Sequence, residues 1–352
     1  MKDKARLGMS GLGSFSVVIA NTIQRSRKVE LVTCFDVAPE RRKATRERYG
    51  CEEERSFEDM VRRDDLDGVL LVTPNAFHRE QTELAAQRGK HVYVEKPIAN
   101  TLEDGRRMIA ACEGAGVTLL IGHVHRRHAA NRKVKELIDR GVIGAPIMVE
   151  ANLSSGQGWD LKPDEFRWRS DDSGCPGGAL MTIGVHQADT LNYIFGPIRR
   201  VSAFFKRLLI PAPVEDVTTT IFEFESGLLG YLGCNFASPR TNWMHVYGTE
   251  ANLLRTVARL DRRFDAERAQ GPDQSTRLEL IEKGTTEAKP IPLLVGDPLL
   301  EEIDEFADCI LTGRKPETDG HSALKALALI RAAIESARSG KPVEIGVGSL
   351  SW

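Results

Sequence analysis

Residues 11–16 read Gly-Leu-Gly-Ser-Phe-Ser and follow directly on a short apolar segment, Ala5–Met9. Gly11 permits a tight turn at the end of a strand, and Gly13 lets the backbone approach a pyrophosphate at the N-terminus of the next helix. The third small position of such a turn is Ser16, which still allows close packing of helix on strand. The stretch predicts a dinucleotide-binding turn.

Apolar segments and polar helical stretches alternate through the first third of the chain. The further expected strands are Glu30–Phe35, Gly68–Thr73, His91–Val94 and Thr118–Ile121, and the expected helices are Phe15–Ser26, Pro39–Tyr49, Ala76–Arg88 and Leu102–Ala115. Continuous apolar strands separated by helices predict βαβ units and a parallel sheet. We therefore expect an α/β fold with a doubly wound (Rossmann) NAD(P)-binding domain over residues 1–123.

The pattern changes near Gly122. An amphipathic helix is expected at Asn131–Arg140 and a last helix at Ser322–Arg338. Between them, strands follow one another at Val217–Phe224, Gly227–Phe236, Asn242–Tyr247 and Asn252–Thr256. Residues 124–352 are therefore expected to form a substrate-binding and oligomerisation α+β domain with a largely antiparallel open sheet. Alternating apolar residues on that sheet favour a homodimer or homotetramer, and cover by the domain's own helices is the alternative.

Composition excludes several classes of protein. The chain has 352 residues, with 48 basic against 50 acidic side chains and a net charge of -2, which argues against a nucleic-acid or anionic-membrane partner. It contains no apolar run near the ~18 residues of a membrane span and no secretory-type apolar start. The six cysteines are far apart, so reduced thiols in the cytoplasm fit better than disulfides or a metal site.

A carboxylate ends the second expected strand. Asp36 follows Gly11 by 25 residues, close to the spacing of the acidic residue that binds ribose hydroxyls in dinucleotide-binding folds. Its charge would repel a 2′-phosphate, which favours NAD. Arg41 and Arg42 leave NADP open, because a basic side chain there can hold a phosphate; a solvated helix face is their alternative role.

Polar residues also follow the third and fourth expected strands, at the sheet edge where doubly wound folds bind ligands. The third strand leads into Thr73-Pro74-Asn75 and then His78, and the fourth leads into Glu95-Lys96-Pro97. A lysine in an arbitrary position is usually a solvated or snorkelling side chain. The motif around Lys96 points to another role.

These stretches together resemble the Gfo/Idh/MocA oxidoreductase family, which includes inositol, glucose and other sugar dehydrogenases. The resemblance rests on G-x-G at 11–13, Asp36, T-P-N-x-x-H at 73–78 and, most specifically, G-K-H-V-x-x-E-K-P at 89–97. It continues through G-H-V-H-R at 122–126, Trp168-Arg169, the run from Gly177 to Asp189, and V-Y-G-T-E at 246–250, and so covers nearly the whole chain.

The resemblance implies roles for individual residues. Lys96 would be the catalytic lysine and His186 its partner, and Pro97 would follow a cis peptide bond. Substrate contacts are expected from His125, Arg126, Thr182 and Asp189. Cofactor contacts are expected from Gly11, Leu12, Gly13, Ser14, Phe15, Asp36, Arg41, Thr73, Pro74, Asn75, His78, Glu95, Lys96, Trp168 and Arg169.

One position departs from the family pattern: the aspartate usually found four residues before the histidine is Thr182 here. In a regular helix Thr182, His186, Asp189 and Tyr193 share one face. A neutral threonine cannot raise the basicity of His186 as a carboxylate would. Each residue also has a structural alternative. Thr182 would simply pack on the helix face, Asp189 would support a neighbouring side chain, and His186 would be a hydrogen-bonded histidine of the core.

Three clustered histidines raise the question of a metal. His123 and His125 share a face only in a strand, and His125 and His128 only in a helix, so the three do not converge as ligands must. We expect no metal, and prefer contacts from His125 and Arg126 to substrate hydroxyls.

The sequence thus predicts an NAD(P)-dependent dehydrogenase, with NAD favoured, that acts on a secondary alcohol of a sugar, polyol or sugar derivative. Either Lys96 or His186 can take the hydroxyl proton, and the residues do not decide between them. A dihydrodiol or other cyclic-alcohol dehydrogenase is the alternative enzyme. A non-catalytic nicotinamide-sensing regulator on the same fold is the alternative outside enzymes.

Overall fold

The computed structural model describes residues 3–156, 158, 174–257 and 276–346. Its internal contacts divide the chain into two units. The first contains residues 3–124 and, from late in the chain, Asp297–Leu324; the second contains the described residues from His125 onward outside that segment. The chain thus returns to its first unit near the C-terminus, whereas the sequence suggested a single division after residue 123.

The first unit is built on a six-stranded parallel sheet in the order β3-β2-β1-β4-β5-β6. Its strands are β1 (Ala5–Ser10), β2 (Val29–Phe35), β3 (Glu52–Glu53), β4 (Gly68–Leu71), β5 (His91–Glu95) and β6 (Leu119–Gly122). Its helices are α1 (Ser14–Arg25), α2 (Pro39–Tyr49), α3 (Phe57–Arg62), α4 (His78–Gln87), α5 (Leu102–Ala115) and α8 (Pro298–Thr312). The predicted doubly wound sheet is confirmed.

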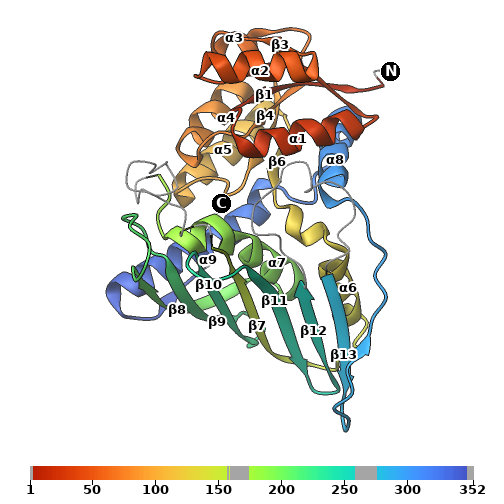
Figure 1. The fold of residues 1–352 in the computed structure, drawn as a ribbon, viewed down its shortest axis with the longest axis vertical. Helices are drawn as coiled ribbons and strands as arrows, with labels where there is room; N and C mark the ends of the chain where they lie inside the picture. Colours follow the sequence, from red (N-terminus) through yellow and green to blue (C-terminus); the bar gives the residue numbers. More distant parts are fainter. Residues whose placement is uncertain (1–2, 157, 159–173, 258–275, 347–352) are drawn as a thin grey trace. The chain divides into compact units, whose positions relative to one another are not determined.

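The order of the strands indicates where on the sheet a ligand would bind. The chain moves outward from β1 to β2 and β3 on one side and to β4, β5 and β6 on the other, so the switch point lies between β1 and β4. Ligands bind beside such a point, at the carboxyl ends of the strands. Helix α8 packs against α1 and beside β1 and β2 (Figure 1), and contributes Ile303 and Phe306 to the core that contains Leu7 and Leu70.

The second unit is built on a nine-stranded sheet in the order β14-β13-β12-β11-β7-β10-β9-β8-β15. Its strands are β7 (Pro146–Ser154), β8 (Ile198–Lys206), β9 (Val217–Phe224), β10 (Leu229–Asn235), β11 (Thr241–Gly248), β12 (Ala251–Val257), β13 (Thr276–Glu282), β14 (Lys289–Pro290) and β15 (Val343–Glu344). Its helices are α6 (Ala129–Asp139), α7 (Val185–Phe195) and most of α9 (Gly320–Ser339).

The largely antiparallel sheet is confirmed, with one difference. Strands β7 and β10 pair in parallel, and no strand was expected from the sequence at Pro146–Ser154. The cause is chain order: β7 precedes α7 and inserts between β10 and β11, so it cannot be joined to β10 by a tight turn.

The two faces of this sheet differ. On one face α7 packs against β7, and Ser336 of α9 accepts a hydrogen bond from the backbone N–H of Ala203 in β8. The register pairs residues so that one common face carries exposed apolar side chains. These are Met148, Phe204, Ile221 and Leu229, of which Phe204 is 76% exposed.

Three further observations bear on the class of protein. No helix among the described residues is long and apolar enough to cross a membrane. All six cysteines are buried and none is in a disulfide. Within the same residues, no group of three or more His, Cys, Asp or Glu side chains is arranged to hold a metal ion.

Candidate active site

The glycine turn after β1 has the geometry that a bound pyrophosphate needs. Gly11 has φ +89°, and a Cβ there would lie 2.6 Å from the carbonyl oxygen of Val72, so only glycine fits. A Cβ at Gly13 would meet nothing within 4 Å, which leaves open space in front of α1. Gly13 caps α1 without a side-chain hydrogen bond, and the first turn of α1, which begins with Ser14 and Phe15, lies where such folds bind an anion.

Ser16 takes the third small position of the turn. It is 3% exposed, and its hydroxyl donates to the carbonyl oxygen of Gly13 at 2.6 Å. The side chain thus ties the first turn of α1 to the glycine loop and leaves the open space in front of Gly13 unfilled.

Asp36, at the end of β2, faces the glycine turn. Its Oδ2 accepts the backbone N–H of Leu12 at 2.7 Å, and its Oδ1 accepts that of Ala38 at 2.9 Å. Each carboxylate oxygen retains acceptor capacity, because an ionised carboxylate has about four lone-pair sites. Arg41 lies 3.6 Å away from Oδ2, and Arg42 donates to the backbone carbonyl of Asp36 at 2.6 Å. The carboxylate is therefore held ready for ribose hydroxyls, with one guanidinium beside it.

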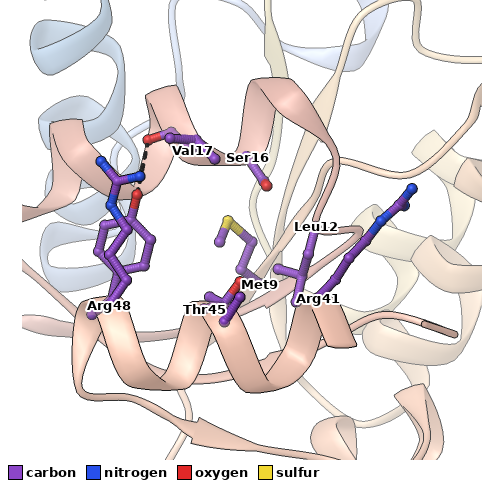
Figure 2. Close-up of a pocket in the computed structure, with 9 residues that line it drawn as sticks. Met9, Leu12, Ser16, Val17, Arg41, Thr45 and Arg48 are labelled. Atoms are coloured by element: carbon purple, nitrogen blue, oxygen red, sulfur yellow. Dashed lines mark hydrogen bonds between the residues drawn. The ribbon is translucent and has the colours of Figure 1, made fainter. Parts of the chain in front are cut away.

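A pocket of about 160 Å³ lies between α1 and α2 (Figure 2). Leu12 and Arg41 line one end of it and Arg48 the other, and Tyr49 also lines the pocket. Because Leu12 and Arg41 also contact Asp36, the pocket adjoins the expected ribose site.

His78 links the ends of two strands. Its Nδ1 lies 3.0 Å from the carbonyl oxygen of Pro97, and its Nε2 lies 3.0 Å from that of Thr73. The ring is fully buried, and burial lowers the pKa of His78. The imidazole therefore holds the loop after β4 against the loop after β5.

Sequence reasoning missed three polar residues that complete these loops, namely Ser10, Gln81 and Asn100. Gln81 accepts a hydrogen bond from the hydroxyl of Thr73 at 2.8 Å and donates to Ser10 at 3.2 Å, and Asn75 donates to Asn100 at 3.2 Å. Gln81 lies one helical turn after His78, and this spacing was the available signal.

Lys96 follows β5 directly and is half-buried. The Lys96–Pro97 peptide bond is cis, as expected. The backbone N–H of Lys96 donates to Oε2 of Glu95 at 3.3 Å. In the first unit, Gly11, Asp36, Thr73 and Lys96 thus stand at the carboxyl ends of β1, β2, β4 and β5.

In the second unit, three histidines group around the start of α7. The rings of His125 and His186 stack, with centroids 3.9 Å apart and planes 14° apart. His128 meets His125 edge-on at 5.1 Å, and Asn131 donates to the carbonyl oxygen of His125 at 2.7 Å. The ring of His186 therefore packs against another imidazole, that of His125.

Arg126 and Asp189 are buried and paired with each other. Nε of Arg126 donates to Oδ2 of Asp189 at 2.9 Å, and Nη2 donates to Oδ1, which gives a two-point ion pair. The guanidinium also lies over the ring of Tyr193, 5.3 Å from its centroid. The arrangement fits the buttress that the sequence offered as the alternative for Asp189.

Thr182 lies in a π-helical turn, Leu180–Gly184, that precedes α7. Its hydroxyl donates to the carbonyl oxygen of Gly178 at 2.6 Å and lies 3.3 Å from Sγ of Cys175. The common face expected for Thr182 and His186 assumed a regular α-helix, and the wider turn changes that spacing. Trp168 and Arg169 lie outside the described residues.

A parallel sheet with a glycine turn, a carboxylate after β2 and a lysine after β5 defines a dinucleotide-binding oxidoreductase. The comparisons agree. A family model described as "Oxidoreductase family, NAD-binding Rossmann fold" matches residues 5–123, and one described as "GFO/IDH/MocA C-terminal domain" matches residues 131–254. The chain belongs to the GFO/IDH/MocA oxidoreductase family and is an NAD(P)-dependent oxidoreductase.

Three similar proteins illustrate the family. D-apiose dehydrogenase of Paraburkholderia graminis is 30% identical over 340 residues, which cover 90% of this chain and 83% of that protein. A putative NADPH-dependent oxidoreductase from Desulfitobacterium hafniense has a TM-score of 0.91 at 34% identity and covers 98% of this chain and 99% of its own. The WlbA dehydrogenase from Bordetella pertussis, in complex with NADH and UDP-GlcNAcA, has a TM-score of 0.81 at 28% identity, with 97% and 99% covered.

Proposed function

We propose that this protein transfers a hydride between nicotinamide and a secondary alcohol of a sugar, polyol or sugar derivative. The observation that carries the proposal is Lys96, which directly follows β5 at the same sheet edge as the glycine turn and Asp36. The names of similar proteins, among them a D-apiose dehydrogenase, support a sugar as the substrate.

The described residues suit the handling of the cofactor. The N–H groups at the start of α1 would hold the pyrophosphate, and Asp36 would accept from the ribose hydroxyls. When bound, nicotinamide supplies the hydride chemistry. The loops tied by His78 would fix the position of Lys96.

Oxidation of an alcohol also releases a proton, and Lys96 and His186 share this task in our proposal. Lys96 would orient the hydroxyl and stabilise the developing alkoxide, and either side chain can accept the proton. The roles of both residues rest on the family motifs that they occupy. His125 would contact the substrate or support His186 through the stacked rings.

A substrate panel tests the function. Aldoses, polyols, anhydro sugars and cyclic diols are offered to the purified chain with NAD⁺ and with NADP⁺, and reduced nicotinamide is followed by absorbance. Turnover of a sugar or polyol is expected. Turnover of cyclic diols alone would move the protein to the alternative enzyme class. Tight NAD binding without turnover of any alcohol would contradict an enzymatic function and favour a nicotinamide sensor.

Cofactor preference depends on Asp36. We expect NAD to bind more tightly than NADP, and Asp36→Ala to narrow the difference, because the variant loses acceptors for the ribose hydroxyls and the repulsion of a 2′-phosphate. Loss of one charge-assisted hydrogen bond of about 1.5 kcal/mol lowers NAD affinity about tenfold. Calorimetric titration with both cofactors measures the effect, and Arg41→Ala is the matched variant. Equal affinities in the unaltered chain would point to Arg41 as a phosphate ligand.

Thr182 offers a test of His186. Thr182→Asp places a carboxylate near the start of α7, which favours the imidazolium form and raises the pKa of His186. If neutral His186 accepts the proton, the acidic limb of the kcat profile moves to higher pH. Thr182→Val keeps the shape and should leave the limb in place, whereas His186→Ala should abolish it. An unmoved limb, with His186→Ala raising only KM, would leave Lys96 as the sole acceptor.

The sheet of the second unit supports the proposal of a homodimer or homotetramer. Met148, Phe204, Ile221 and Leu229 form an exposed apolar face, which a second copy of the same face can cover. Light scattering of the purified chain measures the assembly, and a monomer at micromolar concentration would contradict it. A cytoplasmic location is proposed from the six buried thiols, and we propose no nucleic-acid or membrane partner.

A further inference from the structure

The phenol of Tyr93 lies between two buried carboxyl groups in the first unit. Its oxygen is 2.9 Å from Oε1 of Glu95 and 3.0 Å from Oε1 of Glu302. Tyr93 and Glu302 are 0% exposed and Glu95 is 8% exposed. Tyr93 and Glu95 are two residues apart on β5 and so project from the same face, and Glu302 reaches them from α8.

The number of protons at this cluster follows from its hydrogen bonds. A phenol has one hydrogen to donate, and an ionised carboxylate can only accept. Burial and the two neighbouring carboxyl groups raise the pKa of Tyr93 well above its usual value, so the phenol keeps its hydrogen. With both carboxyl groups ionised, one of them would face a lone pair of the phenol without a hydrogen between the two oxygens. One carboxyl group must therefore be protonated.

The surroundings decide which carboxyl group carries the proton. Glu95 accepts the backbone N–H of Lys96 through Oε2, and a hydrogen bond to a carboxylate favours its ionised form. Glu302 is more deeply buried, and desolvation favours the neutral form of a carboxyl group.

We propose that protonated Glu302 donates a hydrogen bond to Tyr93 and that Tyr93 donates one to ionised Glu95. This series of hydrogen bonds keeps a negative charge on Glu95, next to the backbone N–H of Lys96. Tyr93 and Glu302 are then positioning residues, which act on Lys96 through Glu95. The catalytic consequence rests on the proposed function, whereas the position of the proton does not.

The absence of a side chain at Gly122 leaves room for the cluster of Tyr93, Glu95 and Glu302. Gly122 pairs with Glu95 across β6 and β5, and a Cβ on Gly122 would lie 2.5 Å from the phenol oxygen and 2.9 Å from Oε1 of Glu95. Phe306, one turn after Glu302 on α8, packs edge-on against the ring of Tyr93 at 6.0 Å. The two carboxyl groups and the phenol therefore occupy a space that a side chain at position 122 would close.

Other titratable groups lie near these elements. Lys96 follows the cluster on the chain, and buried His123 follows Gly122. The other described acidic side chains of α8 that have assigned partners bind away from Tyr93: Asp304 to Ser26, Glu305 to Arg314 and Asp308 to Lys28.

Infrared spectroscopy detects the buried proton directly. At pH 8 the unaltered protein should show a carbonyl band of a protonated carboxylic acid, and Glu302→Gln should remove it. Glutamine retains the shape and can still donate to the phenol oxygen. Glu301→Gln, at an exposed site on the same helix, is the control and should retain the band. Absence of the band from the unaltered protein would overturn the proposal, even where Glu302→Gln does not fold.

The effect on Lys96 is measured separately, as the pH midpoint for labelling of Lys96 by an amine-reactive reagent, read by mass spectrometry. Glu95→Gln should lower this midpoint, because it removes a negative charge that favours the ammonium form. Glu302→Gln should leave the midpoint unchanged, since it replaces one neutral group by another. A shift in Glu302→Gln as large as in Glu95→Gln would assign the charge to Glu302. Labelling needs no turnover, so failure of the proposed function would leave this result readable.

Discussion

Lys96→Ala is expected to lower kcat by about 10²–10⁴-fold, the range typical of a lost acid–base group. In the proposed mechanism the variant removes the group that orients the substrate hydroxyl, while the glycine turn, Asp36 and the loops held by His78 stay in place. NAD affinity, measured by calorimetry, should therefore change little. Steady-state kinetics on the best substrate of the panel give kcat.

A matched surface lysine controls for general effects. Lys43 lies on α2 with its side chain 66% exposed, beside Glu47, and Lys43→Ala should leave turnover unchanged. Near-normal turnover in Lys96→Ala would rule out a catalytic lysine despite the motif. A large loss of NAD affinity in Lys96→Ala would instead make Lys96 a cofactor ligand.

The double variant Lys96→Ala/His186→Ala tests whether the two residues serve one step. Residues that act as a unit are strongly non-additive, so the double variant should lose about as much activity as the more damaging single variant. If the fold-loss in kcat of the double variant equals the product of the two single losses, the two side chains act in separate steps.

Local patterns were sufficient to predict five of the six strands in the sheet of the first unit, all but the two-residue β3. The turn at Gly11 and Gly13 and the continuous apolar strands each depend on neighbours in the sequence, so the parallel sheet and its ligand edge could be predicted. The cis bond before Pro97 could be expected from the motif. The same reasoning did not place α8 in this unit, because its partners, such as Leu7 and Tyr93, lie about 200 to 300 residues earlier in the chain.

The second unit shows where such reasoning fails. The helical spacing of Thr182 and His186 was read with an α-helical period, and no local signal announced the π-helical turn at Leu180–Gly184. The stack of His125 on His186 joins residues 61 positions apart and likewise depends on tertiary packing. The shared proton at Tyr93 requires three side chains from β5 and α8 at once, which only the folded structure brings together.

Asp189→Asn is expected to cost about 3–5 kcal/mol of stability, because it removes the negative charge that Asp189 places against the buried guanidinium of Arg126. Both side chains are almost fully buried, with 6% of the Arg126 and 1% of the Asp189 side chain exposed. The substitution is nearly isosteric, so lost packing contributes little. Urea unfolding measures the change, followed by a signal from the second unit, such as fluorescence of Trp243.

The double variant Arg126→Leu/Asp189→Leu separates a structural pair from a substrate-binding pair. Replacing both charges by apolar groups leaves neither member of the buried pair charged, so it should destabilise less than Asp189→Asn alone, as found when whole buried ion pairs are replaced. If Arg126 and Asp189 serve only the substrate, Asp189→Asn would instead raise KM and leave the urea midpoint unchanged. A lowered midpoint in Asp189→Asn that the double variant partly restores would assign Asp189 to the support of Arg126, which follows the stacked His125 directly on the chain.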